Sequence, residues 1–170
     1  MNEGIVLTKI DYRGIAEVTL NRPERNNAYN GEMISELIKS FTSLYKNNDV
    51  RIVLIRGLGK HFQGGADLEW LKEIGKLNEQ ENIEVSRNTA SAIKGLTEFP
   101  KPTIAMIHGG CFGGGTGIAA AADIVIASED AIFSIAILFF KAAISFCKAS
   151  TVPSINCSFT FAAFLIFLAR

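Results

Sequence analysis

Hydrophobic residues recur along this chain with two different periods, which predict strands that alternate with helices. Two short β-rich runs, residues 5–10 and 15–20, flank the polar stretch Asp11–Gly14 and predict an antiparallel hairpin. Asn30 is a plausible N-cap for a helix of roughly sixteen residues. The apolar residues at helical spacing that predict its buried face are Met33, Ile34, Leu37, Ile38, Phe41 and Leu44.

Residues 51–57 form a nearly continuous apolar run, typical of a strand that is covered on both faces. This run favours a parallel or spiral sheet. The glycine-bearing turn that follows leads straight into a helix, with Asp67 near the helix start, where a carboxylate suits the helix dipole. Residues 76–99 predict a further helix that closes at Pro100. Its candidate buried positions are Ile83, Ala90, Ile93, Leu96 and Phe99.

Residues 104–123 predict a strand, a tight turn and a helix start in close succession, and further strands are predicted at 123–128 and 131–134. The apolar run Ile104–Ile107 breaks at Gly109, and the glycines 113–115 precede an alanine-rich segment. Glycines allow another group to approach closely, and the first N–H groups of a helix point outwards unpaired. The stretch therefore suits a polarised carbonyl oxygen or an oxyanion, although close packing of helix on sheet would give the same pattern.

Charge and composition divide the chain near residue 130. The whole chain carries 17 basic and 17 acidic residues, which gives no reason to expect nucleic acid or an anionic membrane as a partner. The last forty residues contain no acidic group and hold eight of the twelve phenylalanines. We therefore expect a core over residues 1–134 and an atypical apolar tail over 135–170. The start of the chain shows no targeting pattern, so a cytoplasmic location is expected.

The cysteines and histidines form no metal-binding or redox pattern. Cys111, Cys147 and Cys157 lack metal-ligand spacing, and we expect them to be reduced and buried. His61 and His108 lie beside glycine turns, where a buried or loop-capping role is favoured over that of a base or ligand. The sequence therefore predicts no metal site.

The motifs of this chain, taken in order, resemble those of the crotonase (enoyl-CoA hydratase/isomerase) superfamily over about residues 5–134. The motifs are LNRPERNNA (20–28), IVLIRG, HFQGGADL, KPTIAMIHGGCFGGGTGI and AADIVIASEDAIF. The chain is most similar to the branch that hydrates methylglutaconyl- and isohexenylglutaconyl-CoA, whose members can carry an FGGGxG pattern. The resemblance implies an α/β fold with a crotonase-like ββα spiral core. The usual C-terminal helices, which build a trimer, are expected to be missing.

The resemblance also implies a ligand and a set of site residues. Family members hold the carbonyl oxygen of an acyl-CoA thioester between two backbone N–H groups, which match Ala66 and Gly114. The residues implied to line the CoA groove are Arg25, Ala28, Lys60, Gln63, Gly65, Asp67, Leu68 and Gly113. Arg25 and Lys60 are candidates for the CoA phosphates, or they are simply solvated loop charges. No cofactor is implied beyond the CoA thioester itself, and a homotrimer or hexamer is the implied assembly.

Two glutamates that activate water in typical hydratases have no counterpart in this sequence. The first position corresponds to Gly117 and the second falls near Ile137, with no carboxylate beyond Asp130. General acid–base help is worth roughly 10²–10⁴ in rate, so hydration is expected to be weak or absent. A non-catalytic protein that binds acyl-CoA or a partner subunit is the alternative. Isomerisation and thioester hydrolysis also remain open, since the fold permits them.

Three explanations for the tail are compatible with its composition. It is an altered end produced by a reading-frame change, a membrane-associating segment, or a replacement helix that buries itself in the sheet or in another subunit. The uncharged run 149–169 is interrupted by Pro153 and several polar residues, a poor match to a span of about 20 apolar residues. Stable membrane insertion is therefore not expected.

Overall fold

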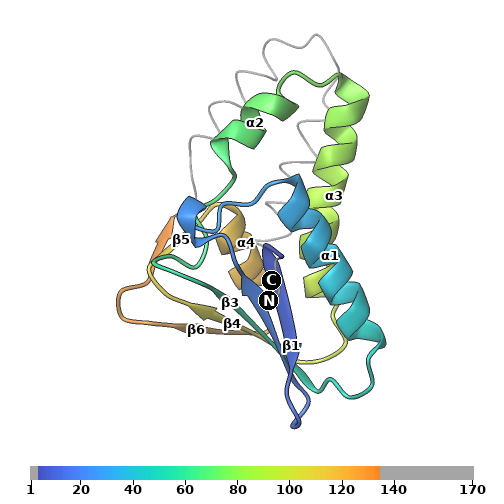
Figure 1. Cartoon of the computed structure of the whole chain (residues 1–170), viewed down its shortest axis with the longest axis vertical. Helices are drawn as coiled ribbons and strands as arrows, with labels where there is room; N and C mark the ends of the chain where they lie inside the picture. The colour runs from blue at the N-terminus through green and yellow to red at the C-terminus, as the bar shows by residue number, and fades with distance from the viewer. Residues whose placement is uncertain (1–3, 135–170) are drawn as a thin grey trace. The chain divides into compact units, whose positions relative to one another are not determined.

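A five-stranded sheet in the order β1-β2-β3-β4-β6 forms the base of the fold (Figure 1). The computed structural model describes residues 4–134, and the chain divides into the units Met1–Ser134 and Ile135–Arg170. The predicted tail therefore lies outside the described residues. The first two strands are antiparallel, and all other neighbours in this sheet are parallel. These strands are β1 (Val6–Ile10), β2 (Ile15–Leu20), β3 (Ile52–Gly57), β4 (Thr103–Ile107) and β6 (Ile124–Ala127).

The predicted hairpin is confirmed, and an aspartate closes its turn. The carboxylate of Asp11 accepts hydrogen bonds from the backbone N–H groups of Arg13 and Ile15 at 2.9 and 3.0 Å. Short polar side chains hydrogen-bond nearby backbone in this way and so favour turns over continued strands. The chain reverses here and brings Val6 opposite Leu20.

The helices begin where their capping residues predict. The side chain of Asn30 accepts a hydrogen bond from the Met33 N–H group at 2.9 Å, which confirms the predicted N-cap. Asn78 and Glu81 form a reciprocal capping box at the next long helix. The helices are η1 (Pro23–Arg25, a 3₁₀ turn), α1 (Gly31–Lys46), α2 (Leu68–Ile74), α3 (Glu79–Thr97) and α4 (Gly114–Ala121).

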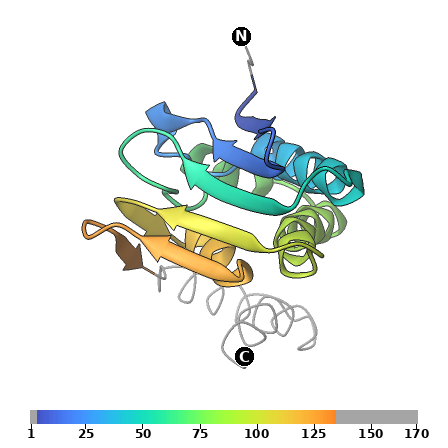
Figure 2. The same cartoon turned by 90° about the horizontal axis from the view of Figure 1, so that it is seen from below.

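The hydrophobic core lies between one face of the sheet and helices α1, α3 and α4 (Figure 2). Val53 and Ile55 of β3 point into this core and are fully buried, whereas Leu54 between them is only half-buried. The prediction that this strand is covered on both faces is therefore wrong for the part of the chain that the structure describes. The core-facing residues of the helices are Met33, Leu37, Phe41, Leu44, Leu96, Ile118 and Ala119.

Burial along α3 differs in detail from the prediction. Leu96 of the helix and Phe99, just beyond its end, are buried as expected, while Ile83, Ala90 and Ile93 are half-buried. Ala92 is also buried, which the sequence pattern did not predict, and the helix packs against α1. None of the helices within residues 4–134 is long and apolar enough to cross a membrane.

The predicted turn after β4 is itself a short strand. β5 (Gly110–Phe112) pairs in parallel with β7 (Ile132–Ser134) and forms a separate two-stranded sheet. Residues 124–127 of the edge strand β6 are exposed on both faces within the described part of the chain. The sequence pattern identified the apolar runs but not this second sheet, since its pairing partner lies about twenty residues away in the chain.

Candidate functional site

Three loops meet at one edge of the sheet, because they follow the carboxyl ends of the parallel strands β2, β3 and β4. They are loop 21–28, which contains η1, loop 58–67, and loop 108–113, which contains the short strand β5. Backbone hydrogen bonds join them directly. The Phe62 N–H group donates to the His108 carbonyl at 2.9 Å, and the Gly64 N–H group donates to the Asn26 carbonyl at 2.7 Å. The middle loop is thus held on both sides.

Asn27 connects the first loop to the second from a fully buried position. Its side-chain nitrogen lies 2.8, 2.9 and 3.2 Å from the carbonyl oxygens of Leu58, His61 and Phe62. Its side-chain oxygen accepts a hydrogen bond from the Arg22 N–H group at 2.9 Å. The backbone of Asn27 is left-handed, with φ of 55°, a conformation that asparagine tolerates better than most residues. Sequence analysis missed this residue.

A buried ion pair fixes the start of α2 against the same loop. The Arg22 guanidinium lies 2.7 Å from the Asp67 carboxylate and also donates to the Ala28 carbonyl at 2.8 Å. The other carboxylate oxygen of Asp67 caps α2 by accepting from the Glu69 N–H group at 2.8 Å. Burial acts to raise the pKa of Asp67, but Arg22 and the helix N–H groups outweigh it and hold the pKa below its usual value.

The second and third loops run parallel to each other in a defined register. Gln63 and Cys111 form a parallel bridge, in which the Gln63 N–H group donates to Gly110 at 3.1 Å and the Phe112 N–H group donates to Gln63 at 2.8 Å. Three residues further along the two segments stand Ala66 and Gly114. The structure therefore brings the two predicted amide donors onto neighbouring segments.

Two glycines let these segments approach each other just before the donors. Gly65 and Gly113 both have positive φ, 92° and 52°. A Cβ atom on Gly113 would lie 3.7 Å from the Cα atom of Gly65, which shows how closely the two backbones pass. L-residues rarely adopt this backbone region, so both positions favour glycine.

The N–H groups of Ala66 and Gly114 are free within residues 4–134, for different reasons. Gly114 is the first residue of α4, and such N–H groups have no partner inside the helix. Ala66 lies one residue before the N-cap of α2 and bridges Tyr29 in parallel, but that bridge uses the Gly65 carbonyl and the Asp67 N–H group. Both residues therefore lie at the start of a helix, Gly114 within its first turn and Ala66 just before the N-cap.

Tyr29 packs directly against Gly114, a contact that sequence analysis missed. A Cβ atom at position 114 would lie 2.5 and 2.9 Å from the Tyr29 ring atoms Cε1 and Cδ1. The ring also meets Trp70 of α2 edge-on, with 5.7 Å between ring centroids. Burial raises the pKa of the Tyr29 hydroxyl. The neighbouring ring thus leaves room only for glycine at position 114.

The predicted phosphate ligands are exposed residues of the first and second loops. Arg25 forms an ion pair with Glu69 at 3.0 Å, and both side chains are largely exposed. Lys60 is exposed and makes no ion pair within the described residues. Leu68, in the first turn of α2, is 73% exposed although it is apolar. Of the two basic residues, Arg25 is paired with a carboxylate and Lys60 is not, within the described residues.

The side chains of Gln63 and Asp67 are committed to the protein interior. Gln63 is 1% exposed, and its side-chain oxygen accepts a hydrogen bond from the Gly65 N–H group at 3.1 Å. Asp67 is buried by the contacts described above. Their predicted contact with CoA could therefore come only from the backbone.

His61, His108 and Cys111 have structural roles. The His61 ring nitrogen Nδ1 accepts a hydrogen bond from the Gly110 N–H group at 2.8 Å, and His108 binds the Gly59 carbonyl at 2.9 Å. Cys111 is fully buried, and burial raises the pKa of its thiol to about 11. These contacts agree with the predicted loop-capping role of the histidines, and the burial of Cys111 is confirmed, while Cys147 and Cys157 lie outside the described residues. Within residues 4–134 no group of three metal-ligating side chains is arranged around a common point.

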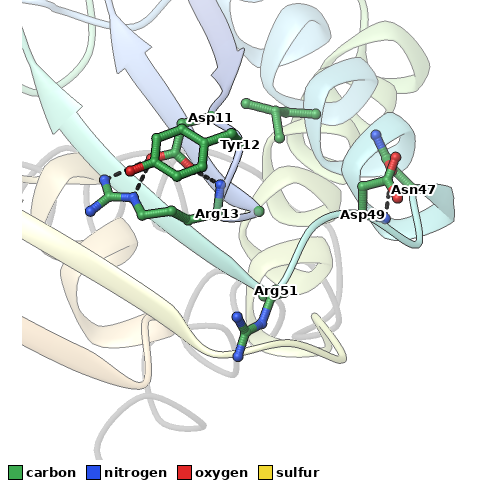
Figure 3. A pocket seen from close by; sticks show the side chains of 8 residues that line it. Asp11, Tyr12, Arg13, Asn47, Asp49 and Arg51 are labelled. Carbon is green, nitrogen blue, oxygen red and sulfur yellow. Dashed lines mark hydrogen bonds and ion pairs between the residues drawn. The ribbon is translucent and has the colours of Figure 1, made fainter.

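A separate shallow pocket lies at the opposite edge of the sheet, beside the β1–β2 turn (Figure 3). Its volume is about 560 Å³. The charges of Asp11 and Arg13 pair with each other at 2.7 Å, and Arg51 points away from that pair. The pocket therefore presents no convergent set of functional groups.

Comparison with known proteins places this arrangement in a family. The family model described as enoyl-CoA hydratase/isomerase matches residues 11–149. The match runs beyond residue 134, where the sequence resemblance was expected to end. The peroxisomal Delta(3,5)-Delta(2,4)-dienoyl-CoA isomerase of Arabidopsis thaliana is 35% identical over 76% of this chain and 50% of its own length. The mitochondrial enzyme of that name from Mus musculus is 36% identical over 71% of this chain and 39% of its own length.

Solved structures agree with these sequence matches. The crystal structure of an enoyl-CoA hydratase from Shewanella pealeana superimposes with a TM-score of 0.78 and 31% identity. It covers 82% of this chain and 52% of the solved chain. The chain spans about half the length of the curated relatives it matches.

Proposed function

The chain belongs to the enoyl-CoA hydratase/isomerase family, and on that premise we propose that it binds an acyl-CoA thioester and polarises its carbonyl. The backbone N–H groups of Ala66 and Gly114 hold the thioester oxygen. Loop 21–28 and loop 58–67 receive the CoA moiety.

One observation carries this proposal: the register between the second and third loops. The Gln63–Cys111 bridge sets Ala66 and Gly114 at the same step of two adjacent parallel segments, and both N–H groups lack an acceptor within residues 4–134. Backbone N–H groups that are fixed before the ligand arrives need no reorganisation when charge develops. Two such donors that converge on one oxygen would form an oxyanion hole.

The proposed chemistry follows from the charge of an enolate. When a thioester loses an α-proton, or accepts a nucleophile at its β-carbon, negative charge moves onto the carbonyl oxygen. Two fixed donors stabilise that charge more than they stabilise the neutral thioester, and one such donor is typically worth about 3 kcal/mol. Steric bulk at either position matters, whereas side-chain chemistry there does not.

Hydration is proposed to be impaired because neither position expected to carry a water-activating glutamate holds a carboxylate in the sequence. Gly117, the first position expected to carry a glutamate, has no side chain, and a Cβ atom there would face Ile93 of α3 at 3.7 Å. The second position, near Ile137, lies outside the described residues. Water addition needs a group that activates the water, so the two amides alone would leave this step slow.

Isomerisation of an unsaturated acyl-CoA is the second candidate function. It is favoured by the relatives whose names identify them as Delta(3,5)-Delta(2,4)-dienoyl-CoA isomerases. Such a reaction moves protons along the acyl chain through the same type of enolate and consumes no water. A protein that binds the thioester without turnover is the remaining alternative.

A fluorescence titration tests binding and turnover together. Trp70 is the only tryptophan in the chain and contacts Tyr29, so its emission reports on the site. We expect crotonyl-CoA to change the emission with saturation, and to be hydrated slowly or not at all. Loss of crotonyl-CoA absorbance well above background would contradict the impaired hydration, and conversion of a 3,5-dienoyl-CoA would favour isomerisation. Absence of any binding would overturn the proposed function.

Removing the charge of Lys60 tests whether this lysine contacts the CoA phosphates. Lys60→Gln is expected to weaken CoA binding a few-fold, and the loss should shrink as salt rises. Lys76→Gln, an exposed lysine after α2, is the matched control and should leave CoA affinity unchanged. Equal effects of the two variants would argue against a phosphate contact at Lys60.

A further inference from the structure

Tyr29 touches both residues that carry the proposed amide donors. Its backbone N–H group donates to Gly65 and its carbonyl accepts from Asp67, both at 2.9 Å, so its backbone brackets Ala66. Its ring lies against the Cα atom of Gly114, where a Cβ would come within 2.5 Å of Cε1. Tyr29 therefore contacts both donor residues, Ala66 through its backbone and Gly114 through its ring.

The hydroxyl of this tyrosine has no hydrogen-bond partner among residues 4–134. Every buried side-chain nitrogen or oxygen within residues 4–134 has a hydrogen-bond partner. The Tyr29 hydroxyl makes no hydrogen bond to another described residue. The residue is partly exposed, so its side chain is not closed off by the described part of the chain.

The protonation state of the hydroxyl suits a donor. Partial burial raises its pKa above the ordinary value of 10, so the phenol remains protonated through the physiological range. A phenol offers one O–H donor and is a common partner for a developing oxyanion. Gln63, the other side chain that contacts Gly114, directs its oxygen at the Gly65 N–H group instead.

We propose that the Tyr29 hydroxyl donates a hydrogen bond to the bound thioester enolate, as a third donor beside the amides of Ala66 and Gly114. This inference rests on the proposed function and adds a side chain to it. The hydrogen bond forms without any covalent change in Tyr29. This hydrogen bond would stabilise the negative charge of the enolate oxygen. Position 117, where a glutamate is expected, is a glycine and offers no side chain there.

Acetoacetyl-CoA is the probe that tests this inference, because it enolises readily and its enolate absorbs in the near ultraviolet. We expect the full chain to raise the enolate fraction of bound acetoacetyl-CoA. Tyr29→Phe keeps the ring and its packing but should lower that bound enolate fraction about tenfold, the effect of one hydrogen bond to a charged acceptor. Its affinity for free CoA, read from Trp70 emission, should not change.

Tyr12→Phe is the matched control, since Tyr12 is 97% exposed beside the opposite edge of the sheet. It should behave as the unaltered chain. Thermal unfolding of Tyr29→Phe verifies that the fold is retained. An enolate fraction that is equal in the unaltered chain and in Tyr29→Phe overturns this inference alone. Absence of bound enolate in the unaltered chain overturns the proposed function with it.

Discussion

Replacing Asn27 tests the idea that one buried side chain holds the site loops together. Its amide has two hydrogens for three carbonyl oxygens at 2.8 to 3.2 Å, and its oxygen accepts from the Arg22 N–H group. Alanine would remove about three hydrogen bonds at roughly 1 kcal/mol each. Alanine at this position would also have to adopt φ of 55°, which costs about 1 kcal/mol more because, unlike asparagine, it has no polar side chain that hydrogen-bonds locally.

Asn27→Ala is therefore expected to lower the free energy of unfolding by about 4 kcal/mol, a large share of the 5–15 kcal/mol typical of a domain. Asn27→Gly should be less destabilised by about 1 kcal/mol, because glycine adopts positive φ freely. Asn27→Asp keeps the acceptor but turns an oxygen towards three carbonyls, so it should be at least as destabilised as alanine at neutral pH. Urea unfolding followed by Trp70 emission gives all three values.

Asn48→Ala is the control, since Asn48 is exposed just beyond α1. It should change the free energy of unfolding by less than about 0.5 kcal/mol. A loss below about 1 kcal/mol in Asn27→Ala would refute the reasoning, because a single ordinary hydrogen bond would account for it. Equal losses in the alanine and glycine variants would refute the part that concerns the backbone.

Three further predictions concern the residues around the donors. Gly114→Ala should cost about 1–3 kcal/mol of stability through the clash with the Tyr29 ring, and a double-mutant cycle with Tyr29→Ala should relieve most of that cost. The pKa of Asp67 is lower in the folded protein than in the unfolded chain, so its contribution is fully present above about pH 4 to 5 and is lost as pH falls through the folded pKa. The unfolding free energies of the unaltered chain and Asp67→Asn should accordingly converge on acidification, and a constant gap would contradict the role of the Arg22 pair. Cys111 should resist iodoacetamide at pH 8 until the chain unfolds, as peptide mass spectrometry can measure, and rapid labelling of the native protein would contradict its burial.

Local sequence signals predicted most of the elements because the interactions that form them are local. The Asn30 cap lies three residues from its partner, and the Asp11 turn closes within four residues. The sequence also predicted the helix start after the glycine run 113–115, because the strand, the turn and the helix follow one another in the chain. Each of these features is decided by neighbours in the chain.

The parts of the site that sequence analysis missed depend on distant residues. The carbonyls bound by Asn27 lie more than thirty positions away, and nothing near Asn27 indicates them. Tyr29 meets Gly114 only because the loop register aligns them. The two consecutive asparagines at 26 and 27, both with positive φ, were the one local signal that could have marked an unusual backbone. Burial on the second face of β3 was mispredicted because a continuous apolar run cannot reveal which layers cover it.

The central claim is that the Ala66 N–H group binds a thioester oxygen, and a proline substitution removes that one donor. Both hydrogen bonds of the Tyr29 bridge come from residues 65 and 67, so Ala66→Pro leaves them available. Ala66→Ser keeps the N–H group and serves as the matched control. Titration of each variant with acetoacetyl-CoA and with free CoA, alongside thermal unfolding, gives the comparison.

The account predicts that Ala66→Pro loses about 3 kcal/mol of enolate stabilisation, a factor of roughly a hundred, and keeps its affinity for free CoA, while Ala66→Ser keeps both. An undiminished bound enolate in a folded Ala66→Pro protein would contradict the claim.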